Sequence, residues 1–107
     1  MIWNQENQEK IVRNLLDQVY EKNIAFEVYG NQRVIAMICP QTLSSDKTNW
    51  LRRKRNTVLR FAMSSLEVSE KNKGNEQAFV EKYGLSREDY TLTYGGVPIF
   101  DEYHNLV

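Results

Sequence analysis

The sequence has few of the features that mark disulfide-rich, membrane-spanning or strongly charged proteins. Its 107 residues include one cysteine, Cys39, so an internal disulfide is excluded and a reducing, cytoplasmic setting is expected. No stretch approaches the roughly twenty apolar residues that a membrane span needs. The 14 basic and 14 acidic side chains cancel, which leaves no global field to attract nucleic acid or an anionic membrane. We expect neither partner.

Residues that would indicate catalysis or metal binding are equally scarce. The one histidine, His104, has no second histidine or cysteine at metal-ligand spacing, so a zinc site is not expected. Cys39 ends an apolar run, where a buried, inert thiol is the usual interpretation, and its pairing with His104 as a nucleophile is disfavoured. Ser64-Ser65 lacks a nucleophile elbow. The sequence therefore favours a binding or scaffold protein over an enzyme.

The residues that are present predict one domain of the α+β class. Apolar side chains recur every three or four positions over residues 5–23, which predicts an amphipathic helix. Residues 24–29 alternate between apolar and polar, and an apolar run covers residues 34–39. With Gly30-Asn31 between them, these segments predict a β-hairpin whose second strand is central in a sheet.

The second half of the chain predicts more helix and a return to the sheet. Ser44, Ser45 and Asp46 offer N-cap oxygens for a long, unbroken helix over residues 47–66. Residues 76–83 predict a short helix, with Gly84 suited to its C-terminal cap. Residues 90–94 predict a third strand, which continues at 97–100 after Gly95-Gly96.

The predicted long helix carries the candidate site. One broad arc of its helical wheel is apolar and includes Trp50, Leu51, Val58 and Phe61. The adjoining stripe holds Asn49, Arg53, Thr57, Arg60 and Ser64, so two guanidinium groups stand about two turns apart. Lys54 and Ser65 fall inside the apolar arc, where an unpaired ammonium is costly, so Lys54 is expected to reach water or a partner.

Two interpretations of these residues stay open. The basic run 52–55 is either a charged face in water or, with Arg60, part of an anion site or a subunit contact. The amides of Gly95-Gly96 either form an anion-binding nest or allow a bend between strand segments. The candidate ligand-binding residues are Trp50, Arg53, Lys54, Arg60, Ser64, Ser65, Gly95 and Gly96.

A family resemblance rests on two motifs. Residues 40–66, P-Q-T-L-S-S-D-K-T-N-W-L-R-R-K-R-N-T-V-L-R-F-A-M-S-S-L, and Y-G-G-V-P-I at 94–99 resemble the heme-degrading domain family of GlcG and HbpS relatives. Its pattern N-x-W-I-x-R-K-x-x-V-x-R-F-x-x-S-S is matched at Trp50, Arg53, Lys54, Val58, Arg60, Phe61, Ser64 and Ser65. The resemblance covers residues 11–99. It implies a profilin-like or roadblock-like antiparallel sheet flanked by helices, assembly as a homo-oligomer, and association with heme or small organic acids.

Relatives of this kind usually begin earlier and continue into a further strand and helix. The chain is therefore expected to be a single GlcG/HbpS-like domain over residues 1–107 that lacks terminal elements. The predicted function is a non-catalytic, oligomeric binding or scaffold protein with a site for a small anion. The alternative is heme binding or heme breakdown, with an axial ligand from His104, Met37, Met63 or a tyrosine.

Overall fold

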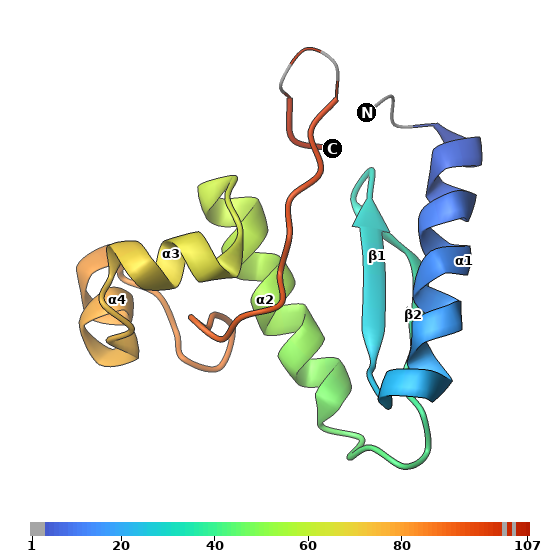
Figure 1. Ribbon diagram of the computed structural model, residues 1–107. Coiled ribbons are helices and arrows are strands. Elements are labelled where there is room, and N and C mark those ends of the chain that lie inside the picture. Colours follow the sequence, from blue (N-terminus) through green and yellow to red (C-terminus); the bar gives the residue numbers. More distant parts are fainter. Residues whose placement is uncertain (1–3, 102, 104) are drawn as a thin grey trace. The chain divides into compact units, whose positions relative to one another are not determined.

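A computed structural model describes residues 4–101, 103 and 105–107 of the chain (Figure 1). The described residues form four helices and a two-stranded antiparallel sheet, which confirms the α+β class. The elements are α1 (Gln5–Lys22), β1 (Phe26–Gly30), β2 (Arg33–Ile38), α2 (Lys47–Phe61), α3 (Ser65–Lys71) and α4 (Glu76–Tyr83). None of these helices combines the length and the apolar character that crossing a membrane requires.

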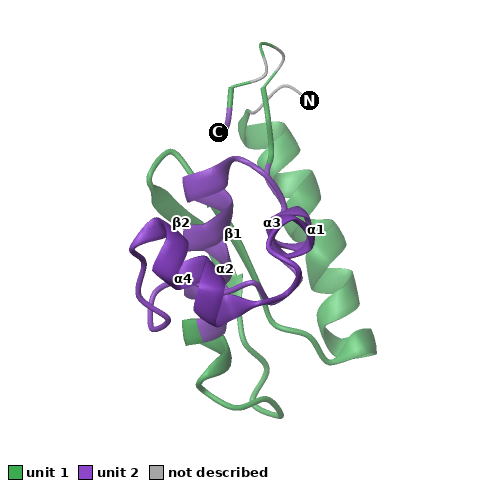
Figure 2. Ribbon diagram, turned by 90° about the vertical axis from the view of Figure 1, so that its left-hand side faces the viewer, with its two compact units in different colours: residues 1–49, 99–105, 107 green, residues 50–98, 106 purple. Residues whose placement is uncertain are grey.

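The chain divides into two compact units, which Figure 2 shows in different colours. Unit 1 falls within residues 1–49, 99–105 and 107, and contains α1 and the β1–β2 hairpin. Unit 2 falls within residues 50–98 and 106, and contains α3, α4 and most of α2. Each unit has its own hydrophobic core.

Helix α1 of unit 1 forms where the sequence predicts it. The Asn4 side chain caps its start by accepting the Asn7 amide at 2.9 Å, and Asn23 ends it in the left-handed conformation with φ of 52°. Its apolar stripe packs on the hairpin, and Val19 is fully buried against Phe26 and Val28. The prediction of an amphipathic helix over 5–23 is confirmed to within one residue.

The hairpin of unit 1 is also confirmed, with one difference in its sheet. Asn31 and Gln32 make the turn with positive φ, and a bulge between Val28 and Tyr29 lets Ile35 and Ala36 both pack on the core. The sheet of the described residues has only two strands, so the prediction that the second strand is central is wrong. Central placement would need the predicted C-terminal strands, which do not form there.

The predicted long helix of residues 47–66 is wrong, because α2 ends at Phe61. Ala62 turns left-handed with φ of 52°, although its amide still donates to the Val58 carbonyl at 2.8 Å. Ser64 then starts α3 by accepting the Glu67 amide at 3.1 Å. This S-x-x-E spacing is a helix-start signal in the sequence that competes with the continuing apolar periodicity.

Helix α4 agrees with its prediction at both ends. Asn75 caps its start, and Gly84 ends it with φ of 66°. Its buried Phe79 and Val80 join Val68 and Leu92 in the core of unit 2. The rings of Phe61, Phe79 and Tyr83 pack with centroids 4.9–5.6 Å apart.

The segment that follows α4 is irregular, so the predicted strands at 90–94 and 97–100 are wrong apart from an isolated bridge at Phe100. Strand prediction from alternation assumes that a neighbouring strand supplies the hydrogen-bond partners. Here the buried backbone of residues 91 and 92 bonds to side chains of α2 and α4 instead.

Candidate ligand-binding site

In unit 2, one face of α2 fastens residues 88 and 89. The Arg52 guanidinium contacts the Asp89 carboxylate at 2.9 Å and donates to the Glu88 carbonyl at 2.7 Å. One helical turn later, Asn56 donates to the Asp89 carbonyl at 2.9 Å. Because Arg52 and Asn56 are four residues apart, they lie on the same side of the helix. They hold the start of the irregular segment against α2.

Side chains of α2 and α4 together fix residues 91 and 92. The Thr57 hydroxyl donates to the Thr91 carbonyl at 2.8 Å and accepts the Thr91 amide at 3.2 Å. From α4, Glu76 Oε1 accepts the Thr91 hydroxyl at 2.6 Å and the Leu92 amide at 2.8 Å. Thr57 and Thr91 are at most 1% exposed, so the two bonds between them are shielded from water, whereas the bonds to Glu76 are partly buried.

Arg53 of α2 contacts both its own helix and the segment that this network holds. Its guanidinium carbon lies 4.0 Å from the centroid of the Trp50 ring, a stacked cation–π contact. Nη2 donates to the Tyr90 carbonyl at 3.3 Å. Nε is buried and has no hydrogen-bond partner among the described residues. The stacked guanidinium therefore has donor capacity that the described protein atoms do not use.

The charge on Glu76 is stabilised by its surroundings. Burial by itself would raise the pKa of the Glu76 carboxyl, but the hydrogen bonds from the Thr91 hydroxyl and the Leu92 amide oppose it. The positive charges of Arg53 and Arg87 act in the same direction, so the net pKa lies below the ordinary value. Arg87 Nη2 lies 3.6 Å from Glu76 Oε2. The carboxylate is ionised at neutral pH.

The glycine pair packs closely on α2 and the start of α3. A Cβ added to Gly95, whose φ is 118°, would lie 3.3 Å from Lys54 Nζ. At Gly96 it would lie 2.7 Å from Val58 Cγ2, too close for any residue but glycine without a shift. Ser65 holds Gly96 on both sides: its hydroxyl accepts the Gly96 amide at 2.9 Å, and its amide donates to the Gly96 carbonyl at 3.0 Å.

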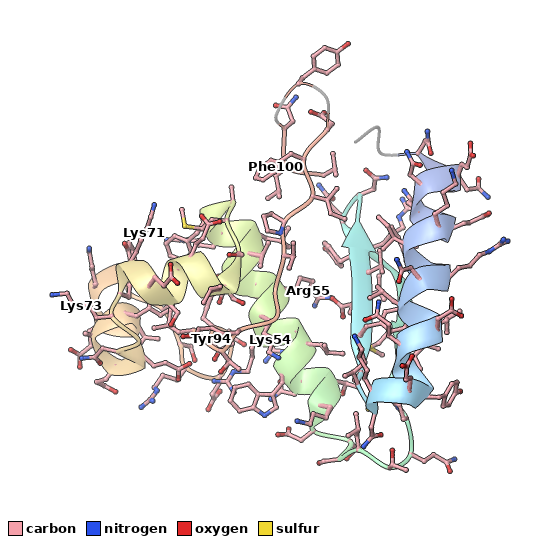
Figure 3. All side chains as sticks on the ribbon, viewed as in Figure 1. Lys54, Arg55, Lys71, Lys73, Tyr94 and Phe100 are labelled. Atoms are coloured by element: carbon pink, nitrogen blue, oxygen red, sulfur yellow. The ribbon has the colours of Figure 1, made fainter. Side chains whose placement is uncertain are left out.

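Within unit 2, six of the eight predicted site residues take part in two groups of contacts. Lys54 and Ser65 border the glycine pair Gly95-Gly96, and Arg53, the residue before Lys54, stacks on Trp50. Figure 3 labels Lys54 beside the C-terminal segment. We call these six residues the α2–glycine cluster. The two predicted site residues outside this cluster are Arg60, which is exposed in the last turn of α2, and Ser64, which caps α3.

Sequence reasoning missed three side chains that shape the cluster: Thr57, Glu76 and Thr91. Thr57 lies on the predicted Arg53 stripe, so its inward position was readable from helical spacing. Glu76 and Thr91 are 15 residues apart, and no local pattern signals that they bond. Only the folded chain places them together.

Unit 1 contains a shallow open groove of about 550 Å³ between α1 and β2. Half of its lining is apolar, and the other half is polar or charged: Val12, Leu16, Ile35 and Ala36, with Gln5, Gln8, Glu9 and Arg13. The cation Arg13 is accompanied by the anion Glu9, and none of the lining residues is a histidine, methionine, cysteine or tyrosine that would bind iron. The groove therefore does not fit heme as a ligated cofactor.

Two of the other candidate heme ligands are methionines, one in each unit. Met37 lies on β2 with 45% of its surface exposed, and Met63 packs against the core of unit 2. His104 lies outside the described residues. Within residues 4–101, 103 and 105–107, no three histidine, cysteine, aspartate or glutamate side chains are grouped so that they could hold a metal ion.

Comparisons with known proteins give a consistent match. The model of the family "Haem degrading protein HbpS-like" matches residues 4–107. A UPF0303 protein of Psychromonas ingrahamii is 31% identical over 87 residues, covering 78% of this chain and 55% of its own length. One from Pseudomonas entomophila is 39% identical over 76 residues, covering 71% and 42%. The chain thus spans about half the length of the curated relatives it matches. No solved structure matches it.

Proposed function

The chain belongs to the HbpS-like family of heme-degrading proteins, and from that premise we propose that it acts as an oligomeric binding protein with a site for a small anion. We propose that both compact units belong to one domain of this family, which the match across residues 4–107 supports. The curated relatives are about twice as long as the matched segment. Any activity of the full-length relatives is therefore assigned to this chain only as a proposal.

The approach of Lys54 to Gly95 carries the proposal of an anion site. The ammonium nitrogen lies 3.3 Å from the position where any other residue would place a Cβ. A cation beside backbone without a side chain leaves room for a ligand oxygen to approach the charge, while the Gly96 amide already donates to Ser65. Small carboxylates and phosphates are the anions that such a cation would bind.

Arg53 adds a second cation with a fixed plane. Stacking on Trp50 and the bond to the Tyr90 carbonyl hold the guanidinium in one orientation, so a ligand loses little of its binding energy to ordering it. Arg60 and Ser64 stay predicted members of the site, since the side chains nearest the glycines belong to Lys54, Val58 and Ser65.

A thermal-unfolding titration with acetate, oxalate and inorganic phosphate, each against potassium chloride at equal ionic strength, tests the site. A ligand at a hundred times its Kd stabilises the native state by about 2.7 kcal/mol. We expect the wild-type chain to be stabilised and Lys54→Gln to lose that response. The matched control is Lys71→Gln, which removes the same charge from an exposed position on α3.

The same titration decides the role of Arg60. If Arg60→Gln keeps the wild-type response, the site is confined to the α2–glycine cluster. Equal stabilities of wild type in every anion and in potassium chloride would refute a specific anion site. An equal loss in Lys54→Gln and Lys71→Gln would reduce the effect to general charge screening.

The oligomeric part of the proposal rests on the family resemblance and on the basic stripe of α2 as a subunit contact. Light scattering of the purified chain over a range of concentrations measures its mass directly. We expect a multiple of 12.6 kDa. A strictly monomeric mass at every concentration contradicts the assembly.

Heme binding is the second candidate, and the description of the matching family favours it. An absorbance titration with hemin tests it in the wild-type chain and in His104→Ala. A saturable shift of the Soret band that His104→Ala abolishes supports ligation by the histidine. No shift in the wild-type chain would remove heme from the proposal.

A further inference from the structure

We infer that Glu76 is a positioning residue of the proposed anion site: its carboxylate fastens residues 90–92 against α2, and through them it holds the Arg53 guanidinium over Trp50. Glu76 contacts no proposed ligand and lies on a different helix, α4. The inference concerns how the site is held in shape and rests on the proposed function for its biological meaning.

The contacts of Glu76 run directly into the backbone that Arg53 uses. Oε1 accepts two bonds, from the Thr91 hydroxyl at 2.6 Å and the Leu92 amide at 2.8 Å. The carbonyl of Tyr90, the residue before Thr91, accepts Arg53 Nη2 at 3.3 Å. If residues 91 and 92 move, that acceptor moves with them, so the orientation of Arg53 depends on Glu76.

Thr57 restrains the same backbone from the side of α2. Its hydroxyl bonds both the amide and the carbonyl of Thr91. Residues 90–92 are therefore clamped between two helices, by a neutral hydroxyl on α2 and a carboxylate on α4. Of these two groups, only the carboxylate changes its charge with pH.

The ionised form of Glu76 is the form that fastens the segment. The charged groups facing it are Arg53 from α2 and Arg87 from the segment after α4. Protonation cancels the attraction to both guanidinium groups and reduces the carboxyl's capacity to accept two short bonds. The Thr91 hydroxyl has a second neighbour, Thr93 Oγ1 at 2.9 Å, to which it can turn. Acid should therefore loosen residues 90–92 and release Arg53.

Fluorescence of Trp50 reports this release without any ligand. The chain has two tryptophans, so Trp3→Phe leaves Trp50 as the single emitter. We expect a reversible change in Trp50 emission on acidification, with a midpoint below the ordinary glutamate pKa, while far-ultraviolet circular dichroism shows that the helices persist. Adding Glu76→Gln should remove this acid step. Glu81→Gln, on the same helix and exposed, is the matched control and should keep it.

A second variant keeps the test decisive if Glu76→Gln does not fold. Thr91→Val removes one hydrogen bond that favours the ionised carboxyl and should move the midpoint to higher pH. An acid step that persists unchanged in Glu76→Gln, or a midpoint that Thr91→Val leaves in place, would overturn the positioning role. Failure of every anion to stabilise the wild-type chain would instead overturn the proposed function, and leaves this readout interpretable.

Discussion

The two compact units bury different kinds of side chain. In unit 1 the buried side chains of the core are those of Val19, Phe26 and Val28. In unit 2, valine, leucine and phenylalanine share the interior with hydroxyl groups. All the buried polar side chains among the described residues belong to this unit: Thr57, Ser65, Ser69 and Thr91.

The difference follows from what each core has to hold. Unit 1 joins a helix to a hairpin, and both elements satisfy their own backbone hydrogen bonds. Unit 2 has to hold the irregular residues 88–96, whose buried amides and carbonyls need acceptors and donors from elsewhere. Hydroxyl and carboxylate side chains supply them. Apolar packing is non-directional, whereas these bonds fix position and orientation, which a binding site needs.

The largest expected effect compares the two aromatic anchors. Phe79→Ala removes a ring that is 1% exposed and packed against Phe61 and Tyr83, and should lower the free energy of unfolding by about 3–5 kcal/mol. Phe26→Ala in unit 1, at 6% exposed, should fall at the lower end of this range. Urea denaturation followed by circular dichroism measures both. A smaller loss in Phe79→Ala than in Phe26→Ala would reverse the ranking of the two cores.

A reciprocal exchange of valine and threonine tests the polar interior most directly. Thr57→Val keeps the shape of the side chain but leaves the Thr91 amide and carbonyl unpaired, a loss of about 1–3 kcal/mol. Val19→Thr places a hydroxyl in the aliphatic core of unit 1. There it should cost about 0.5–2 kcal/mol, since a helical threonine can bond the carbonyl four residues earlier. If either exchange is neutral, the distinction between the two interiors fails at that position.

The glycine pair extends the comparison to backbone packing. Gly96→Ala places a methyl group 2.7 Å from Val58 Cγ2 and should cost about 1–3 kcal/mol through overpacking. Gly74→Ala is the control: no atom lies within 4 Å of its added methyl group, and only its φ of 67° opposes the change, at about 1–2 kcal/mol. Gly96→Ala should also weaken any anion response, whereas Gly74→Ala should not. Loss of the response in both would assign it to stability alone.

The smallest expected effect is a pH dependence that arises in unit 2. The pKa of Glu76 is lower in the folded chain than its ordinary value of 4.5. Its stabilising contribution is therefore present above that value and is lost as the pH falls through the lower, folded pKa. Denaturation midpoints between pH 7 and pH 3 should show a smaller acid loss in Glu76→Gln than in wild type. Glu9→Gln in unit 1 provides the control, and an identical acid loss in Glu76→Gln and wild type would contradict the prediction.

Local signals explain which parts of the fold were predictable from sequence. Helix α1, the hairpin and α4 each combine a clear period with a residue suited to their ends, such as Gly84. The break after α2 was missed because Phe61 and Leu66 continue the apolar period across it, although Ser64 and Glu67 carry a helix-start spacing. The break can be predicted only when the apolar period and the helix-start spacing are considered together.

The irregular segment after α4 and the candidate site depend on contacts between residues that are distant in sequence. The alternation at 90–94 resembles a strand, but Thr57 and Glu76 replace the neighbouring strand that such a segment normally requires. The sequence grouped Lys54 and Ser65 with Gly95 and Gly96 as candidate site residues, but their contacts are seen only in the structure. Their shared role in binding stays a prediction. The contribution of Glu76 could not be read without the tertiary structure.

The side-chain clamps on residues 91–96 have a consequence for solvent exchange. Amides at Thr91, Leu92 and Gly96 donate to oxygens of Thr57, Glu76 and Ser65, so their deuterium uptake should be as slow as that of helix interiors despite the lack of regular secondary structure. Because each of these amides donates to a single side chain, substituting that side chain should remove the protection of that amide alone. A stretch that resembles a loop would then behave, in its opening kinetics, as part of the core.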